Sequence, residues 1–375
     1  MTAITFAFIL HNKVRLLVRS HFCYLCIEGR NIKKDEFMKK SRILCLSLCM
    51  VVLTACAYTQ KGDEMESKTT GNKVYETENS MQQTETFTAE SKVTDVMEDT
   101  AFQGYGRLIF PVDIDIDRSL KLKDVSSILP WYSEVSVSKT VEIVNYMKDQ
   151  ADSGAQIFYD IYSEEEKEAD PDKRDTGLFF FRGQEGAKTA ITNAGGGFMY
   201  VAGIHDSFPH ALELSKLGYN AFALIYRPGA QTACEDLARA IAFLHEHEDE
   251  LQIGMTDYSL WGGSAGARMA AWLGSYGTAY FGEKDYPAPA TVVMQYTGLS
   301  QVTGAESPTY ACVGTSDGIA SYRSMQRYIS QIKSNGTNAE IEVFRGLSHG
   351  FGLGEGTVAE GWIDHAVAFW KENMR

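Results

Sequence analysis

Cysteine is scarce in the larger, C-terminal part of this sequence. Five of the seven cysteines lie within the first 56 residues, and only Cys234 and Cys312 follow them. Two cysteines in apolar surroundings make no disulfide framework; one bridge stays open, but the pattern favours small core residues. No Cys/His cluster has metal-ligand spacing, so the sequence predicts no metal site.

Positive charge is also scarce beyond the N-terminal segment. Residues 1–56 hold nine of the 35 Lys and Arg residues and three of the 49 Asp and Glu residues, which leaves 26 basic and 46 acidic residues. A part of the chain with this excess of negative charge is a poor partner for nucleic acid or an anionic membrane surface. We therefore expect no nucleic-acid partner, and we interpret the acidity as a source of solubility.

Residues 57–100 lack Leu, Ile, Trp and Pro altogether. They are rich in Thr, Ser, Glu, Lys and Gln, so they cannot bury enough apolar surface to offset the chain entropy lost on folding. The composition predicts a disordered tether over 57–100. A folded domain is predicted over 101–375, in which 101–154 forms an N-terminal cap or edge segment.

The segment 38–56 has the pattern of a secretory signal. A basic start at Met38 precedes an apolar run over 43–53, which is too short to span a bilayer. The run ends in Leu-Thr-Ala-Cys56, which resembles a bacterial lipoprotein signal, and this resemblance implies that Cys56 is lipidated and becomes the mature N-terminus. It also implies an extracytoplasmic protein held at the membrane by its lipid alone. A plain signal peptide with an incidental Cys56 is the alternative.

Residues 1–37 precede a normal signal start and therefore need an explanation. The stretch Lys33-Lys34-Asp35-Glu36 can be encoded by A/G-rich codons that resemble a ribosome-binding site just before Met38. We predict that translation begins at Met38 and that 1–37 is an over-extended start.

The most informative motif is Gly262-Gly263-Ser264-Ala265-Gly266, which fits G-x-S-x-G. The apolar run 258–261 predicts a buried strand before it, and 265–273 predicts a helix after it. A strand, a sharp turn and a helix are the context in which this serine is a nucleophile. The start of the helix also directs N–H groups toward the serine. The alternative is a Gly/Ser-rich loop that matches by accident.

From about residue 155, apolar runs alternate with amphipathic segments. The predicted strands are 156–162, 178–181, 189–192, 221–226, 258–261, 291–296, 308–313 and 341–344. The predicted helices are 208–217, 237–244, 265–273, 322–332 and 358–370. Apolar strands separated by helices predict an α/β fold with a mostly parallel sheet of about eight strands, covered on both faces. The strands before the first helix predict an antiparallel edge, and 130–132 with 141–147 predict a loop and a helix near the site.

A serine nucleophile needs a base, and the base needs a group that orients it. Asp317 follows the strand 308–313, and His349 lies in a Gly-rich loop after 341–344. The order Ser264, Asp317, His349 is the one that this architecture requires.

Other histidines and carboxylates fit these roles less well. His205 and His210 follow a Gly-rich loop and stay open as residues of the cleft. The others are expected to be surface, packing or turn residues, or come in the wrong order: His245, His247, His365, Asp257 and Asp364.

An oxyanion needs preorganised N–H donors. Ala265, directly after the nucleophile, supplies one, and the run 193–198 supplies the others because its three consecutive glycines allow a close backbone approach. This run is not a dinucleotide fingerprint, since no further spaced glycine opens a helix.

Over roughly 155–375 these residues together are similar to the α/β-hydrolase superfamily, and within it to the acetyl esterase/lipase group related to hormone-sensitive lipase. The likeness rests on Gly195–Gly197, on Tyr226–Arg227, on Glu235–Asp236 opening the next helix, and on the serine motif with its partners. Ala194 departs from the group, which usually has histidine before the three glycines.

The resemblance implies a triad and an oxyanion hole at the positions already singled out. The triad would be Ser264, Asp317 and His349. The oxyanion hole would be the N–H groups of Gly196, Gly197 and Ala265. It implies a serine carboxylic-ester hydrolase that forms an acyl-enzyme without metal or cofactor and acts on short acyl esters, polysaccharide esters among them. A peptidase of the prolyl-oligopeptidase type and a non-catalytic surface binding protein are the alternatives.

Overall fold

The structure is a computed structural model that describes residues 86–132 and 134–375, all within the compact unit Gln82–Arg375. The predicted start at Met38, the lipidated Cys56 and the tether over 57–85 lie outside the described residues. No helix in the described part of the chain is long and apolar enough to cross a membrane.

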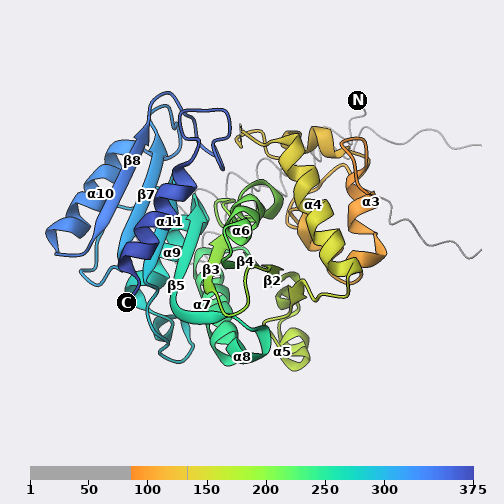
Figure 1. The fold of residues 1–375 in the computed structure, drawn as a ribbon, viewed down its shortest axis with the longest axis horizontal. Coiled ribbons are helices and arrows are strands. Elements are labelled where there is room, and N and C mark those ends of the chain that lie inside the picture. The colour runs from red at the N-terminus through yellow and green to blue at the C-terminus, as the bar shows by residue number, and fades with distance from the viewer. Residues whose placement is uncertain (1–85, 133) are drawn as a thin grey trace, which may run out of the picture. The chain divides into compact units, whose positions relative to one another are not determined.

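A single eight-stranded sheet forms the centre of the described structure (Figure 1). Its order is β1-β2-β4-β3-β5-β6-β7-β8. The strands are β1 (Phe158–Tyr159), β2 (Gly177–Phe181), β3 (Lys188–Asn193), β4 (Asn220–Ile225), β5 (Gly254–Gly263), β6 (Thr291–Gln295), β7 (Thr309–Gly314) and β8 (Ala339–Phe344). Pairing is antiparallel from β1 through β2 to β4 and parallel from there to β8. The predicted parallel sheet with an antiparallel edge is confirmed.

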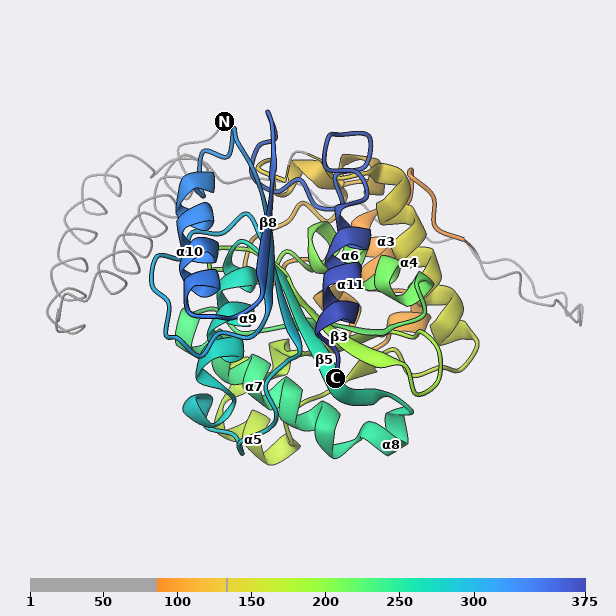
Figure 2. The ribbon, with the colours of Figure 1, turned by 60° about the vertical axis from the view of Figure 1, so that its left-hand side comes forward.

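Helices cover both faces of this sheet. The described α-helices are α3 (Val93–Met97), α4 (Val137–Asp152), α5 (Glu164–Ala169), α6 (Ser207–Lys216), α7 (Ala230–Glu246), α8 (Glu248–Leu251), α9 (Ala265–Tyr276), α10 (Tyr322–Ser334) and α11 (Trp362–Asn373). Figure 2 shows α7, α9 and α10 on one side of the sheet and α6 and α11 on the other, with α4 outside α6.

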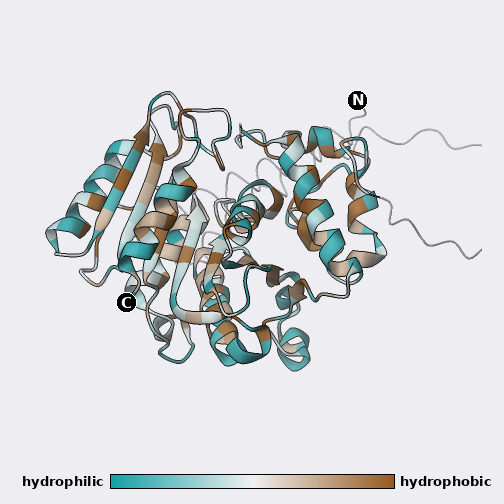
Figure 3. Ribbon diagram, viewed as in Figure 1, coloured by the Kyte–Doolittle hydropathy of each residue, from teal (hydrophilic) through white to brown (hydrophobic). Residues whose placement is uncertain are grey.

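The hydrophobic pattern explains this layering. The strands β2, β4, β6 and β7 are buried along their whole length, so they require cover on both faces. Helix α10 buries Met325, Tyr328, Ile329 and Ile332, whose spacing of three and four places them on one face. In Figure 3 α10 carries hydrophilic residues beside hydrophobic ones.

The predicted tether ends too late, because residues 86–100 are folded. Val93 and Val96 of α3 are fully buried, and Phe87 is 7% exposed. Asn145 of α4 holds the Phe87 backbone through two hydrogen bonds, N–H to Oδ1 at 2.8 Å and Nδ2 to the carbonyl at 2.8 Å. The segment lacks large aliphatic residues, but its few apolar side chains insert into a core that later residues build.

Some predicted boundaries also differ from the structure. The strand predicted over 156–162 is reduced to β1, and the terminal helix predicted from 358 begins at Trp362, after Gly361 at φ 85°. Asp257, expected in a turn, lies inside β5 at φ 58°. Asp236, expected where its helix opens, lies in the second turn of α7.

Candidate active site

Ser264 occupies a sharp turn between β5 and α9. Its backbone, at φ 52° and ψ −113°, is strained for a residue with a side chain, and its N–H donates to the Gln295 carbonyl at 3.0 Å. The flanking glycines leave no room for a Cβ. One at Gly262 would lie 2.3 Å from the Gly266 carbonyl carbon, and one at Gly266 would lie 2.0 Å from the Asn193 carbonyl oxygen. The motif therefore forms a strained turn between a strand and a helix, which is the geometry typical of a nucleophilic serine in this motif.

The structure brings Ser264, His349 and Asp317 into one hydrogen-bonded chain. His349 Nε2 lies 3.1 Å from Ser264 Oγ, and His349 Nδ1 lies 2.9 Å from Asp317 Oδ2. The three side chains come from the ends of β5, β7 and β8, at the same edge of the sheet. Each ring nitrogen of His349 therefore has a hydrogen-bond partner, the Ser264 hydroxyl on one side and the Asp317 carboxylate on the other. This is the arrangement typical of a Ser-His-Asp triad.

The Asp317 carboxylate is itself held by backbone hydrogen bonds. Its side chain is fully buried, and its other oxygen accepts from the N–H groups of Ile319 at 2.8 Å and Ala320 at 2.7 Å. These bonds fix the orientation of the carboxylate that faces His349. The His349 side chain is 8% exposed, and the ring of Tyr296 packs edge-on against it with centroids 4.9 Å apart. The His349 ring is therefore largely shielded from solvent and held between its partners.

The three consecutive glycines follow β3 and lie beside the serine turn. Asn193, the last residue of β3, pairs with Gly262 in the register of β3 and β5. The loop is pinned through its backbone: the Tyr226 hydroxyl donates to the Ala194 carbonyl at 2.6 Å, and the Ala202 N–H donates to the Gly195 carbonyl at 3.1 Å.

Two N–H groups of this loop are available for a ligand. In the described part of the chain, no acceptor takes the N–H of Gly196 or of Gly197. Gly196 adopts φ 141° and Gly197 φ 61°, conformations that favour glycine. Ala265, the first residue of α9, presents a third N–H at the helix start.

Asp206, which was not predicted as a site residue, lies between the short helix η5 (Gly203–His205) and α6. Its side chain is fully buried. Its Oδ2 accepts from the Gly195 N–H at 2.6 Å and from the Tyr132 hydroxyl at 3.3 Å, and its Oδ1 accepts from the Tyr296 hydroxyl at 2.6 Å. Burial, and next the charge of Asp206, hold the pKa of both tyrosines well above the usual value, so both remain donors. No sequence pattern marks this carboxylate.

His205 and His210, which the sequence left open as residues of the cleft, are not part of the triad. His205 is buried, its Nε2 lies 3.0 Å from the Val125 carbonyl, and burial lowers its pKa to about 4. His210 packs edge-on against Trp362, with centroids 5.5 Å apart, and burial lowers its pKa as well. Both are therefore neutral packing residues near pH 7.

The remaining candidates play other parts. His365 is exposed and lies 2.7 Å from Glu342 Oε1, as expected for a surface residue. His245, expected to be solvated, is half-buried and stacks on Tyr286, with centroids 4.9 Å apart. Asp257 pairs with Lys188 at 3.2 Å. None of them contacts Ser264.

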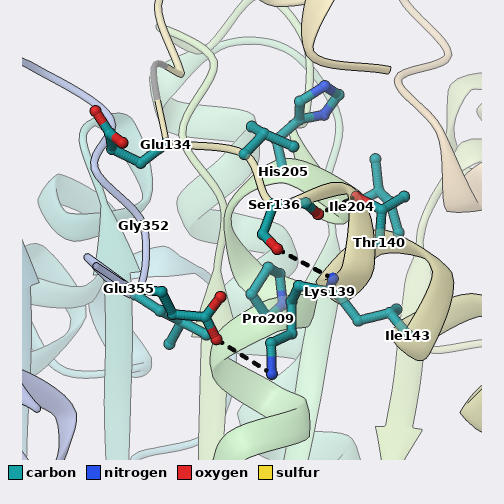
Figure 4. A pocket seen from close by; sticks show the side chains of 12 residues that line it. Glu134, Ser136, Lys139, Thr140, Ile143, Ile204, His205, Pro209, Gly352 and Glu355 are labelled. Carbon is teal, nitrogen blue, oxygen red and sulfur yellow. Dashed lines mark hydrogen bonds and ion pairs between the residues drawn. The ribbon is translucent and has the colours of Figure 1, made fainter. Parts of the chain in front are cut away.

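A small hollow, whose lining includes none of the three triad residues, is shown in Figure 4. Its lining comes from the start of α4, from η5 and from the loop after His349, and includes His205, Lys139 and Glu355. Lys139 Nζ bridges to Glu355 Oε1 at 3.3 Å and to Glu213 Oε1 at 2.7 Å. The ion pair with Glu355 ties the segment before β1 to the loop that follows His349.

No metal centre accompanies these residues. The described residues contain no group of three or more His, Cys, Asp or Glu side chains that could hold a metal ion. Cys234 and Cys312 are both buried free thiols, which confirms that they are core residues.

The solved structures that resemble this chain include esterases. No protein-family model matches the chain, and no curated protein matches it. The Est2 esterase of Thermogutta terrifontis with butyrate bound is 17% identical, with TM-score 0.50, over 59% of this chain and 96% of that one. Its form phosphonylated by cyclosarin is 18% identical, with TM-score 0.47, over 53% and 89%. MGS-M1, an α/β hydrolase from a deep-sea metagenome library, is 18% identical, with TM-score 0.47, over 53% and 92%. The sheet order and the serine turn give this chain the α/β-hydrolase fold.

Proposed function

We propose that this protein is a serine carboxylic-ester hydrolase with Ser264 as nucleophile, His349 as base and Asp317 as the orienting carboxylate. The observation that carries the proposal is the unbroken chain of hydrogen bonds from Ser264 Oγ through both nitrogens of His349 to Asp317. This arrangement turns a weakly nucleophilic hydroxyl into one that attacks a carbonyl at neutral pH.

The chemistry proceeds in two balanced halves. Nε2 of His349 takes the proton of Ser264 Oγ as that oxygen bonds to the ester carbonyl carbon, and the carbonyl oxygen becomes an oxyanion. The N–H groups of Gly196, Gly197 and Ala265 would stabilise this oxyanion. The C–O bond to the alcohol then breaks, and His349 returns its proton to the departing alkoxide. Water repeats the sequence on the acyl-enzyme, releasing the acid and restoring Ser264.

We assign short acyl esters as the substrates, with acetyl esters of polysaccharide among them. The resemblance to the acetyl esterase/lipase group over Gly195–Gly197 and Tyr226–Arg227 supports this assignment. The fold shared with an esterase seen with butyrate makes short straight acyl chains the first series to test.

We also propose that the mature chain begins at a lipidated Cys56 and works outside the bacterial membrane. The basic start at Met38, the apolar run 43–53 and Leu-Thr-Ala-Cys56 support this proposal. Intact-mass analysis of the protein from native cells would show a diacylglyceryl-modified Cys56 as the first residue. A peptide from residues 1–30, or an unmodified N-terminus elsewhere, would contradict it.

The deciding experiment compares p-nitrophenyl acetate, butyrate and octanoate as substrates of the purified protein and of Ser264→Ala. We expect hydrolysis that falls with chain length and is lost in the variant. A fluorophosphonate should label the wild type and not the variant. If the protein hydrolyses a dipeptide p-nitroanilide but no ester, it is a peptidase and not an esterase. Absence of labelling in a folded protein would leave only a binding role.

A further inference from the structure

We propose that Asp206 is a positioning residue that holds the oxyanion loop, Gly195–Gly197, in its catalytic shape. The inference rests on the proposed esterase function. Asp206 is fully buried and binds the first residue of this loop directly, accepting the Gly195 N–H at 2.6 Å. It contacts no substrate position itself, so any effect on the reaction passes through the loop.

The same carboxylate also touches the two other parts of the site. It lies against the residue before the nucleophile, since a Cβ added to Gly263 would be 2.5 Å from Asp206 Oδ2 and 2.6 Å from Oδ1. Its bond to the Tyr296 hydroxyl, at 2.6 Å, fixes the ring that packs against His349. Asp206 therefore links the loop, the serine turn and the environment of the base.

The donors around Asp206 suit an anchor. One peptide N–H and two tyrosine hydroxyls converge on it, from Gly195, Tyr132 and Tyr296. All three are neutral, and hydrogen bonds to a charged acceptor are about twice as strong as those between neutral groups. The loop needs such an anchor because Gly196 and Gly197 have no side chain to restrict them.

Anchoring Gly195 fixes the direction of the peptides that follow it. The Gly195 carbonyl is held by Ala202 at 3.1 Å, and the Gly196 carbonyl by Met199 at 3.0 Å. With the preceding N–H held by Asp206, the free N–H groups of Gly196 and Gly197 keep one orientation. These donors act on charge that develops in the transition state, so a displaced loop lowers kcat rather than raising KM.

The test uses Asp206→Ala, Asp206→Asn and a matched pair of tyrosine variants. Tyr296→Phe removes a hydroxyl that binds Asp206 at 2.6 Å, and Tyr162→Phe removes one that binds the equally buried Asp236 at 2.6 Å, away from the triad. Titration with a fluorophosphonate counts active sites, and kcat and KM for p-nitrophenyl acetate are then expressed per titrated site. The same constants are measured for the thionoester, whose sulfur accepts weaker hydrogen bonds from the loop.

We expect Asp206→Ala to lower kcat about 100-fold with KM nearly unchanged, since losing one oxyanion donor costs about 10²–10³. Asp206→Asn should lose about tenfold, because its carbonyl can accept from Gly195 while its amide donates to the Tyr296 oxygen. Tyr296→Phe should also lose about tenfold, and Tyr162→Phe should keep the wild-type kcat. The preference for ester over thionoester should shrink with kcat, which general destabilisation would not cause.

A kcat within about threefold of wild type in Asp206→Ala, with an unchanged thionoester ratio, would overturn the inference. If that variant does not fold, Asp206→Asn and the tyrosine pair decide by the same criteria. A wild type that is labelled but hydrolyses no ester would sink the proposed function alone. In that case the rate of fluorophosphonate labelling, compared between wild type and the Asp206 variants, tests the role of Asp206, because phosphonylation uses the same N–H donors. A folded wild type that is never labelled would overturn both.

Discussion

Removing the charge of Asp236 should strongly destabilise the fold without disabling the active site. Asp236 is fully buried in α7 and accepts from four donor groups: the Arg227 backbone N–H at 2.7 Å, Arg227 Nε at 3.0 and 3.2 Å to its two oxygens, Arg227 Nη2 at 2.7 Å, and the Tyr162 hydroxyl at 2.6 Å. Arg227 is itself 8% exposed. The pair is therefore a buried ion pair with its hydrogen-bonding capacity filled.

The size of the stability loss follows from the Arg227 charge that Asp236→Asn leaves buried. Breaking a buried pair by removing one charge costs about 3–5 kcal/mol, because the other charge stays buried without compensation. Arg227 keeps a second partner, Asp170, whose side chain is 42% exposed. We therefore place the loss at the lower end, about 3 kcal/mol of unfolding free energy. The exposed partner alone is worth less, so Asp170→Asn should cost about 1 kcal/mol or below.

Urea unfolding followed by tryptophan fluorescence measures both variants, with the slope of each transition compared with the wild type. The folded fraction of Asp236→Asn should keep kcat per titrated site near wild type, because neither residue of the pair contacts the triad. If Asp236→Asn cost no more than Asp170→Asn, the pair could not be the buried, charged unit described above, and the reasoning would be refuted.

Three further predictions concern the triad, the serine turn and pH. Asp317→Asn should lower kcat about 10⁴-fold in ester hydrolysis with little change in KM, and a loss below about tenfold would contradict its orienting role. Gly266→Ala would place a Cβ 2.0 Å from the Asn193 carbonyl, so thermal unfolding should show a loss of about 3 kcal/mol or more; wild-type stability would rule out this turn. Burial lowers the pKa of His205 to about 4 from 6.5, so the unfolded chain binds more protons between these values and stability falls as pH drops through them. His205→Gln should reduce that fall by about 2–3 kcal/mol between pH 7 and about pH 4.5 in urea titrations, and parallel curves for the two proteins would contradict it.

Most of the fold could be predicted from local hydrophobic patterns in the sequence. Strands such as β4 and β7 are continuous apolar runs, and their type could be predicted because such runs are buried on both faces of a parallel sheet. The short β1 could not be bounded, since its apolar neighbours Ile157 and Ile161 are buried outside the ladder. Residues 86–100 were assigned by composition, which measures what a segment can bury alone and not what it adds to a core built elsewhere.

The candidate triad was predictable for a different reason. Ser264, Asp317 and His349 each follow a predicted strand, and the carboxyl ends of parallel strands meet at one edge of a sheet. Asp206 lies in an irregular turn before α6, and nothing in its neighbours distinguishes it from a solvated loop carboxylate. Its partners come from residues 74 and 90 positions away, Tyr132 and Tyr296, so only the folded chain reveals it.

The hydrogen bonds that Tyr226 and Asp206 make to the glycine loop also explain why alanine can precede the three glycines. Ala194 is fully buried, and its carbonyl is held by the Tyr226 hydroxyl at 2.6 Å. The next N–H, of Gly195, is held by Asp206. A loop whose backbone is held on both sides of this peptide needs no side chain at position 194 to shape it. Alanine at a position where the esterase group that the sequence resembles usually has histidine is therefore compatible with an ordered glycine loop, because the hydrogen bonds made by Tyr226 and Asp206 hold its backbone.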